Sequence, residues 1–238
     1  MVTSPDRAAV DEMLKLDSYI DVIIPRGGKD LIKDIKEKSS IPIIKHLDGI
    51  CHVYVEKNAD LKKAKDLILN SKMRRPGICG AAETLLIDES LADHVQELLQ
   101  PLVDAECEIR GDGFIKKLNP IFKKATEKDW GTEYLEKIIS VKLVKGIQDA
   151  INHINHYSSG HTESIITEKK EVFETFYKQI NSAIILQNAS TQFADGGEFG
   201  FGAEIGISTD KLHVRGPVGA EHLTSFKYVI HGNGQVRQ

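Results

Sequence analysis

The amino-acid sequence predicts an α/β fold with a largely parallel sheet. Three observations lead to this prediction. Strand-like and helix-like stretches alternate along most of the 238 residues, which is typical of parallel sheets with crossover helices. Several strand-like stretches are continuously apolar, as expected for strands that are buried on both faces. Hydrophobic residues make up 41% of the chain, enough to form one large core or two smaller ones.

The first elements are short. The spacing predicts a helix over 6–16, and the run "YIDVIIP" predicts a buried strand over 19–25. A glycine turn leads to a helix over 29–39, which is followed by strands over 41–46 and 49–56. In the next helix, over 59–75, the apolar residues form one stripe with lysines on the other face, and Pro76 and Gly77 end it.

The middle of the chain continues the alternation. The predicted elements are a strand over 83–88, a helix over 91–103 that Ser90 can cap, a strand over 139–144, a helix over 147–157, a strand over 162–167, a helix over 168–180 and a strand over 182–188. From about residue 188 the chain becomes rich in glycine, and we expect it to be ordered by close backbone packing. Strand-like residues follow over 207–216, and 226–237 resembles a terminal strand or hairpin.

Composition excludes several classes of protein. Acidic residues outnumber basic ones by 35 to 31, without the basic block that a nucleic-acid-binding protein uses. No apolar run is long enough to cross a membrane, and the N-terminus lacks a signal-peptide pattern. Three widely spaced cysteines form neither a disulfide framework nor a zinc motif. We therefore expect a cytoplasmic protein without a metal, in which His153 and His156 are exposed residues on a helix and not ligands.

Cys79 has an unusual sequence environment. It lies between Gly77 and Gly80, after a helix terminator and before a strand. Small neighbours leave room above the sulfur and let a substrate carbonyl approach backbone N–H groups. Local N–H dipoles, with Arg74 and Arg75 close in sequence, would stabilise a thiolate. Glycine-framed turns are also common around inert residues, so spacing alone leaves both interpretations open.

The other two cysteines favour the simpler interpretation. Cys51 lies inside an apolar strand, and Cys107 has no glycine frame. Each is expected to be a small buried hydrophobic residue.

The segment "RRPGICGAAETLLI" resembles the active-site segment of the γ-glutamyl phosphate reductases, which are members of the aldehyde dehydrogenase superfamily. The resemblance extends to "YIDVIIPRGG", "DWGTEYLEKIISVKLV", "SGHTESIITE" and the long run from 188 to 229. It implies an NADP-dependent glutamate-5-semialdehyde dehydrogenase, which reduces γ-glutamyl phosphate with NADPH during proline biosynthesis. In this family Cys79 would be the nucleophile, and it would form a thioester with loss of phosphate.

The resemblance also suggests binding residues. Arg26, Gly27 and Gly28 would lie near a cofactor phosphate, although an ordinary turn is the alternative. Glu133 would hold a cofactor ribose, unless it is a surface carboxylate. Residues Lys211, His213 and Arg215 alternate, so on a strand they would share one face and bind the substrate, with a solvated strand face as the alternative.

The resemblance divides the chain into four parts. We expect a remnant of the cofactor-binding Rossmann-like domain over 1–52, the catalytic domain over 53–192, a glycine-rich return over 193–224 and an oligomerisation strand or tail over 225–238. Expected partners are therefore a small-molecule substrate and further copies of the chain.

Two departures from the family pattern stand out. Gly80 stands where the family usually has asparagine, and the chain starts where the cofactor-binding half is nearly finished. We therefore expect weak or no activity from this chain alone. The alternative hypotheses are a non-catalytic interaction or oligomerisation module in which Cys79 is a relic, and an aldehyde dehydrogenase or thioesterase-like hydrolase with another substrate.

Overall fold

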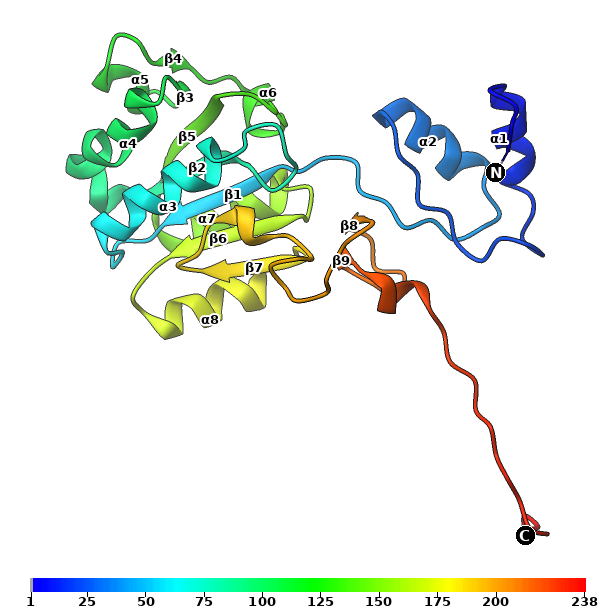
Figure 1. The fold of residues 1–238 in the computed structure, drawn as a ribbon. Helices are drawn as coiled ribbons and strands as arrows, with labels where there is room; N and C mark the ends of the chain where they lie inside the picture. The colour runs from blue at the N-terminus through cyan, green and yellow to red at the C-terminus, as the bar shows by residue number, and fades with distance from the viewer. Residues whose placement is uncertain (1) are drawn as a thin grey trace.

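A parallel sheet with helices on both faces forms the main body of the protein (Figure 1). The computed structural model describes residues 2–238. The seven-stranded sheet has the order β4-β3-β5-β2-β1-β6-β7, and all neighbouring strands in it are parallel. Its strands are β1 (Cys51–Val55), β2 (Ala82–Asp88), β3 (Glu108–Gly111), β4 (Lys123–Lys124), β5 (Ile138–Val144), β6 (Thr162–Ile166) and β7 (Ile184–Gln187).

Two helices precede these strands, and the others alternate with the strands along the chain. The helices are α1 (Arg7–Met13), α2 (Lys29–Lys38), α3 (Leu61–Met73), α4 (Val95–Asp104), α5 (Ile115–Leu118), α6 (Glu127–Trp130), α7 (Gly146–Tyr157) and α8 (Lys170–Gln179). The predicted α/β architecture is confirmed. The strands predicted over 49–56, 83–88, 139–144, 162–167 and 182–188 are β1, β2, β5, β6 and β7.

Alternate residues of the central strands enter two different cores. Val53 and Val55 of β1 pack against α3 and α4 on one face of the sheet. Tyr54, between them, packs with α7 and α8 on the other face. The continuous apolar runs in the sequence follow from this burial on both sides.

The strands predicted over 19–25 and 41–46 are reduced to a single parallel bridge between Ile23 and Ile43. Pro42 has no N–H to donate, and an isolated pair of strands is marginal without a larger sheet. Both segments instead share a small third core with the C-terminal part of the chain, in which Ile44 packs with Val214 and Val218. Figure 1 shows helices α1 and α2 set to one side of the large sheet.

The start of α4 differs from the prediction. Ser90 does not cap a helix over 91–103, because a 3₁₀ turn occupies 89–94 and α4 begins at Val95. Asp88 caps the turn, and its carboxylate accepts hydrogen bonds from the N–H and hydroxyl of Ser90. The short strands β3 and β4 were not predicted, since two to four residues with charged side chains carry little strand pattern.

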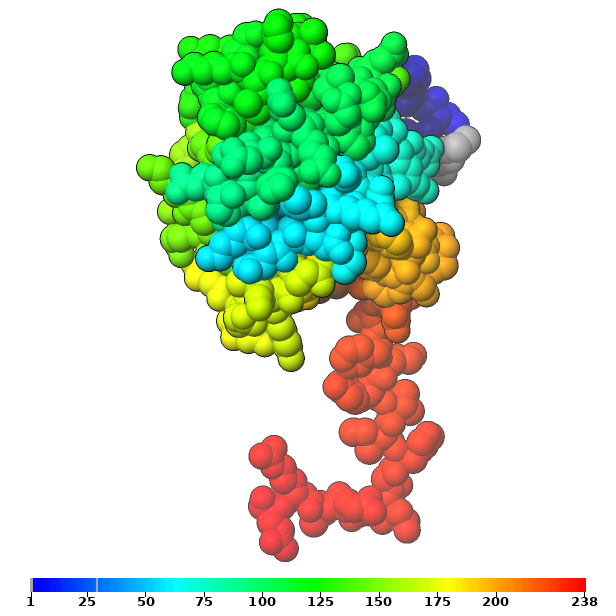
Figure 2. All heavy atoms as spheres, turned by 90° about the vertical axis from the view of Figure 1, so that its left-hand side faces the viewer, coloured from blue at the N-terminus to red at the C-terminus, as the bar shows by residue number. Residues whose placement is uncertain are grey.

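The strands of the C-terminal part are shorter than predicted and differ in position. Only β8 (Gly206–Ser208) pairs, in antiparallel register, with β9 (Gly216–Val218), so residues 211–215 are not on a strand. The terminal strand or hairpin over 226–237 is also absent from the described chain. These residues project from the body with exposed side chains (Figures 1 and 2). Among residues 2–238, no helix is long and apolar enough to cross a membrane.

Candidate active site

Cys79 lies on the loop that joins α3 to β2, at the amino end of β2. It is half-buried, whereas Cys51 and Cys107 are buried, as predicted for them. All three cysteines are free. Cys79 is therefore the most exposed of the three cysteines.

The main chain of Cys79 is closely packed on both sides. A Cβ atom placed on Gly49 would lie 2.1 Å from the carbonyl oxygen of Cys79 and 2.6 Å from its Cα. The thiol of Cys51 donates a hydrogen bond to the same carbonyl, at 3.1 Å. A Cβ on Gly80 would lie 3.3 Å from the carbonyl oxygen of Thr191. The small residues at 49 and 80 therefore allow the loop to fit between two other segments.

Electrostatics disfavour the thiolate in the unliganded chain. Burial raises the pKa of Cys79 to about 11, and the carboxylates of Glu133 and Glu204 add to the rise. The backbone N–H groups of Cys79 and Gly80 act in the opposite direction, as the sequence predicted. Arg74 and Arg75 were expected to lower the pKa of Cys79. This expectation is wrong, because the surroundings of Cys79 raise its pKa overall. Arg74 instead donates a hydrogen bond to Gln192.

Glu133 and Glu204 bring carboxylates to the cysteine from distant parts of the sequence. Glu133 is half-buried and accepts a hydrogen bond from the N–H of Gly49 at 2.8 Å, so it is not a free surface carboxylate. Glu204 accepts from the N–H of Gly196 at 2.9 Å, and burial raises its pKa. The sequence analysis missed Glu204, because a single carboxylate in a glycine-rich run has no distinguishing pattern.

The segment of Arg26, Gly27 and Gly28 leads into α2, as predicted, with Gly28 at the N-cap. Arg26 and Gly27 line a cavity of about 140 Å³ together with Lys45, His46 and Gly206, among others. The guanidinium of Arg26 lies close to Gly206, where an added Cβ would be 3.2 Å from Nη2. Arg26 and His46 also act to lower the pKa of Glu204, the carboxylate that helps to raise the pKa of Cys79.

The structure does not bring Lys211, His213 and Arg215 onto one strand face, because residues 211–215 lie between β8 and β9. Lys211 and His213 are exposed, and Nε2 of His213 lies 2.9 Å from the carbonyl oxygen of His222. Arg215 is half-buried and donates to the side-chain oxygen of Asn181 at 2.8 Å. The alternation in the sequence therefore did not indicate a shared surface.

One histidine is not where the helix pattern placed it. His156 is exposed, as predicted, but His153 is buried on the inner face of α7. Burial lowers the pKa of His153 to about 2, and the charge of Lys142 contributes. Nδ1 of the neutral ring lies 3.2 Å from the ammonium group of Lys142. His153 thus belongs to the core.

A buried ion pair near the cysteine loop was also missed. Lys72, on α3, was assigned to the solvated face, yet its ammonium group lies 2.6 Å from the carboxylate of Glu83 on β2. Both side chains are 0% exposed. Single lysines and glutamates are usually surface residues, so the sequence carried no signal for this pair.

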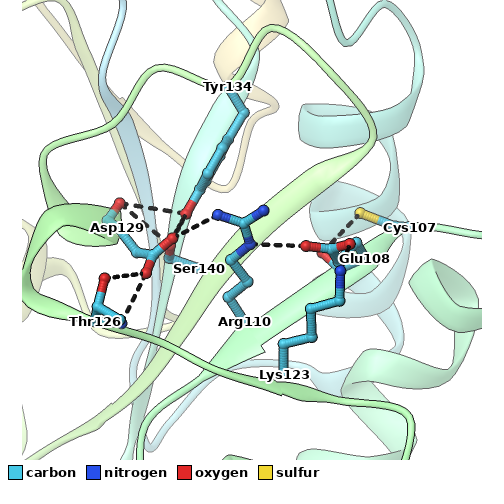
Figure 3. A network of polar contacts seen from close by, with 8 residues as sticks. All are labelled: Cys107, Glu108, Arg110, Lys123, Thr126, Asp129, Tyr134 and Ser140. Carbon is cyan, nitrogen blue, oxygen red and sulfur yellow. Dashed lines mark hydrogen bonds and ion pairs between the residues drawn. The ribbon is translucent and has the colours of Figure 1, made fainter.

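A second polar network holds the segment that carries Glu133. The carboxylate of Asp129 lies between Arg110, which donates at 2.8 Å, and the hydroxyl of Tyr134, which donates at 2.7 Å (Figure 3). The hydroxyl of Tyr134 also lies 2.8 Å from that of Ser140 on β5. Burial alone would raise the pKa of Asp129, but the hydrogen bonds from Thr126, Arg110 and Tyr134 lower it below its usual range.

Comparisons with known proteins identify relatives over the whole chain. The chain is 55% identical to a γ-glutamyl phosphate reductase from Parvibaculum lavamentivorans, over 100% of this chain and 56% of that protein. The crystal structure of γ-glutamyl phosphate reductase from Thermotoga maritima matches with a TM-score of 0.95 and 44% identity, over 100% of this chain and 57% of that one.

A more distant structure has the same fold. An acetylating aldehyde dehydrogenase from Geobacillus thermoglucosidasius matches with a TM-score of 0.75 and 21% identity, over 100% of this chain and 62% of that one. No protein-family model matches the chain. The chain spans about half the length of the curated relatives that it matches.

Proposed function

We propose that the chain belongs to the γ-glutamyl phosphate reductase family, a curated member of which it matches at 55% identity over 56% of that protein, and that it carries the nucleophilic part of an NADPH-dependent glutamate-5-semialdehyde dehydrogenase. The reaction would reduce γ-glutamyl phosphate to glutamate 5-semialdehyde and phosphate, in proline biosynthesis. The observation that carries this proposal is the half-buried Cys79, which is held between glycines and whose thiolate is favoured by the backbone N–H groups of Cys79 and Gly80, which act to lower its pKa.

Cys79 performs the covalent steps in the proposed mechanism. Its sulfur, as the thiolate, attacks the acyl carbon, and the bond from that carbon to the phosphate oxygen breaks, which releases phosphate and leaves a thioester. A bound NADPH supplies the hydride that reduces this thioester. The resulting thiohemiacetal collapses to the aldehyde and restores the thiolate. We propose that the N–H of Cys79 stabilises the oxyanion that forms in both steps.

The cavity beside Arg26 fits the phosphate-bearing part of such a cofactor. Backbone N–H groups at the start of α2 are unpaired within the helix, and an added Cβ on Gly28 meets nothing within 4 Å. Arg26 lines the same cavity and supplies positive charge, as does Lys45, whose ammonium group is paired with Asp210 at 2.7 Å. We propose that Arg26, Gly27 and Gly28 contact the cofactor there and that Glu133, beside Cys79, contacts its ribose.

We propose that Lys211, His213 and Arg215 contact the substrate. Lys211 is exposed and can meet an anion directly, whereas Nε2 of His213 lies 2.9 Å from the carbonyl oxygen of His222 and the guanidinium of Arg215 bonds Asn181. We propose a cytoplasmic location because a nucleophilic thiol must remain reduced, and all three cysteines are free.

The proposal is tested by assaying the purified chain in the reverse direction. Phosphate-dependent reduction of NADP by glutamate semialdehyde would be followed for the native chain and for Cys79→Ala. Because the chain spans about half the length of its relatives, we expect slow turnover that is lost in Cys79→Ala. Turnover that survives in Cys79→Ala would contradict the assignment of the nucleophile.

A second candidate function is self-association through the C-terminal tail, residues 225–238. The side chains of Phe226, Tyr228 and Ile230 are 79%, 84% and 89% exposed, which is unusual for three large apolar residues so close together. An extended segment with free backbone groups can add to the edge of a sheet in another copy. This candidate requires no catalysis by Cys79.

A further inference from the structure

The loop that carries Cys79 is closed at its base by the buried ion pair of Lys72 and Glu83. Lys72 lies in the last turn of α3, before the loop, and Glu83 lies near the start of β2, after it. The ammonium group and the Oε2 atom of the carboxylate are 2.6 Å apart, and neither side chain is exposed. The two ends of the loop are therefore joined directly.

Glu83 also holds the segment that contains Glu133 and Leu135. Its other oxygen, Oε1, accepts a hydrogen bond from the N–H of Leu135 at 3.2 Å. Leu135 has a φ of 55°, a left-handed conformation that a leucine rarely adopts without tertiary contacts. Glu133 is two residues before it and bonds Gly49, which packs against Cys79. One carboxylate thus connects the cysteine loop to the segment that brings Glu133 to it.

The far side of that segment is fixed separately. Asp129 and Tyr134 are tied to Arg110 and Ser140, on β3 and β5 (Figure 3). The hydrogen bond from Leu135 to Glu83 connects the segment to the base of the cysteine loop, where the ammonium group of Lys72 also lies 6.0 Å from the centre of the Tyr134 ring. Loss of the hydrogen bond would leave Glu133 held on this side mainly by its bond from Gly49, and would give it more freedom to move relative to the sulfur.

We propose that Glu83 is a positioning residue that sets the placement of Glu133 against Cys79, through its simultaneous contacts with Lys72 and with the N–H of Leu135. Folding alone does not require such a pair, since buried ion pairs are commonly replaced by apolar residues without loss of stability. The proposal rests on the proposed function in one respect, that Cys79 is the reacting group.

Two double variants of the full chain separate positioning from stability. Lys72→Met with Glu83→Gln removes both charges but keeps a side-chain oxygen that can accept from Leu135. Lys72→Met with Glu83→Leu removes the charges and that acceptor. The rate of alkylation of Cys79 by iodoacetamide would be measured by mass spectrometry as a function of pH. Amide exchange at Leu135 and urea unfolding would be measured on the same samples.

We expect the Gln variant to alkylate at the native rate, within about twofold, and to keep the Leu135 amide protected. In the Leu variant, release of Glu133 and of the loop should lower the pKa of Cys79 by about one unit. That shift corresponds to about tenfold faster alkylation below the pKa. The Leu135 amide should also exchange faster. A purely structural role would change stability without moving this pH profile.

Three outcomes would overturn the proposal. One is an unchanged pH profile in the Leu variant, and another is an equal shift in both variants. The third outcome is an unprotected Leu135 amide in the native chain, which would mean that the hydrogen bond to Glu83 does not persist. Because this measurement needs no variant, the proposal can be tested even if a variant fails to fold. Because no readout here depends on turnover, failure of the reductase assay would leave this proposal standing.

Discussion

Gly49 and Cys79 are in direct main-chain contact, although they come from different segments of the chain. A Cβ on residue 49 would lie 2.1 Å from the carbonyl oxygen of Cys79, a distance that requires the backbone to move. Residue 49 also donates its N–H to Glu133. The position of Cys79 therefore depends on Gly49, which has no side chain and acts only through its main chain.

Gly49→Ala is the first prediction. The added methyl group should displace the loop of Cys79, with a loss of about 1–3 kcal/mol in the free energy of unfolding, as for other overpacked sites. The alkylation rate of Cys79 should change at the same time. Gly113→Ala is the matched control, because nothing lies within 4 Å of an added Cβ there. Urea unfolding of both variants checks the prediction, and equal stabilities would contradict it.

Glu133→Gln should make Cys79 more reactive. The carboxylate of Glu133 helps to raise the pKa of Cys79 to about 11, so removal of its charge lowers that pKa and increases the thiolate fraction at any pH below it. Glutamine keeps an oxygen for the N–H of Gly49. The pH profile of alkylation should move to lower pH, whereas Glu136→Gln, an exposed residue of the same segment, should leave it in place. A profile that moves upward would refute the assignment.

The stability of the chain should fall as the pH rises from about 4.5 to about 7, in part because of Glu83. Burial raises the pKa of Glu83 from 4.5 to about 7, and Lys72 only partly opposes this. The folded chain therefore binds this proton more tightly than the unfolded chain, and the resulting stability is lost as the pH passes through the folded value. Urea unfolding at pH 5 and pH 8 should show a larger loss for the native chain than for Lys72→Met with Glu83→Gln. Identical losses would contradict the prediction.

Deletion of 225–238 should leave folding unchanged but reduce self-association. The side chains of this segment are exposed, so the body loses few contacts. Sedimentation velocity would compare the native chain with this deletion and with a shorter deletion of 232–238, which keeps Phe226, Tyr228 and Ile230. Association that is lost only in the longer deletion would support a role for the apolar residues. Association that persists in both would exclude the tail.

The sequence by itself determined the alternation of strands and helices in the large sheet. Continuous apolar runs identified β1 and β2, because a strand between two layers of helices is apolar on both sides. Glycines around Cys79 singled it out from the other two cysteines, and the resemblance of the segment to the reductases made it the candidate nucleophile, because both features lie within a few residues. Both signals are local.

Only the tertiary structure decided what surrounds the sulfur. Glu204 and Gly49 reach Cys79 from distant segments, and the burial of Lys72 depends on its partner across the loop. The strand predicted over 207–216 formed only at its ends, in β8 and β9, although residues 211–215 have an alternating pattern, because pairing requires a neighbour that the pattern does not specify. Contacts between residues far apart in the chain have no local pattern, and they set the burial and the charge on which the chemistry of Cys79 depends.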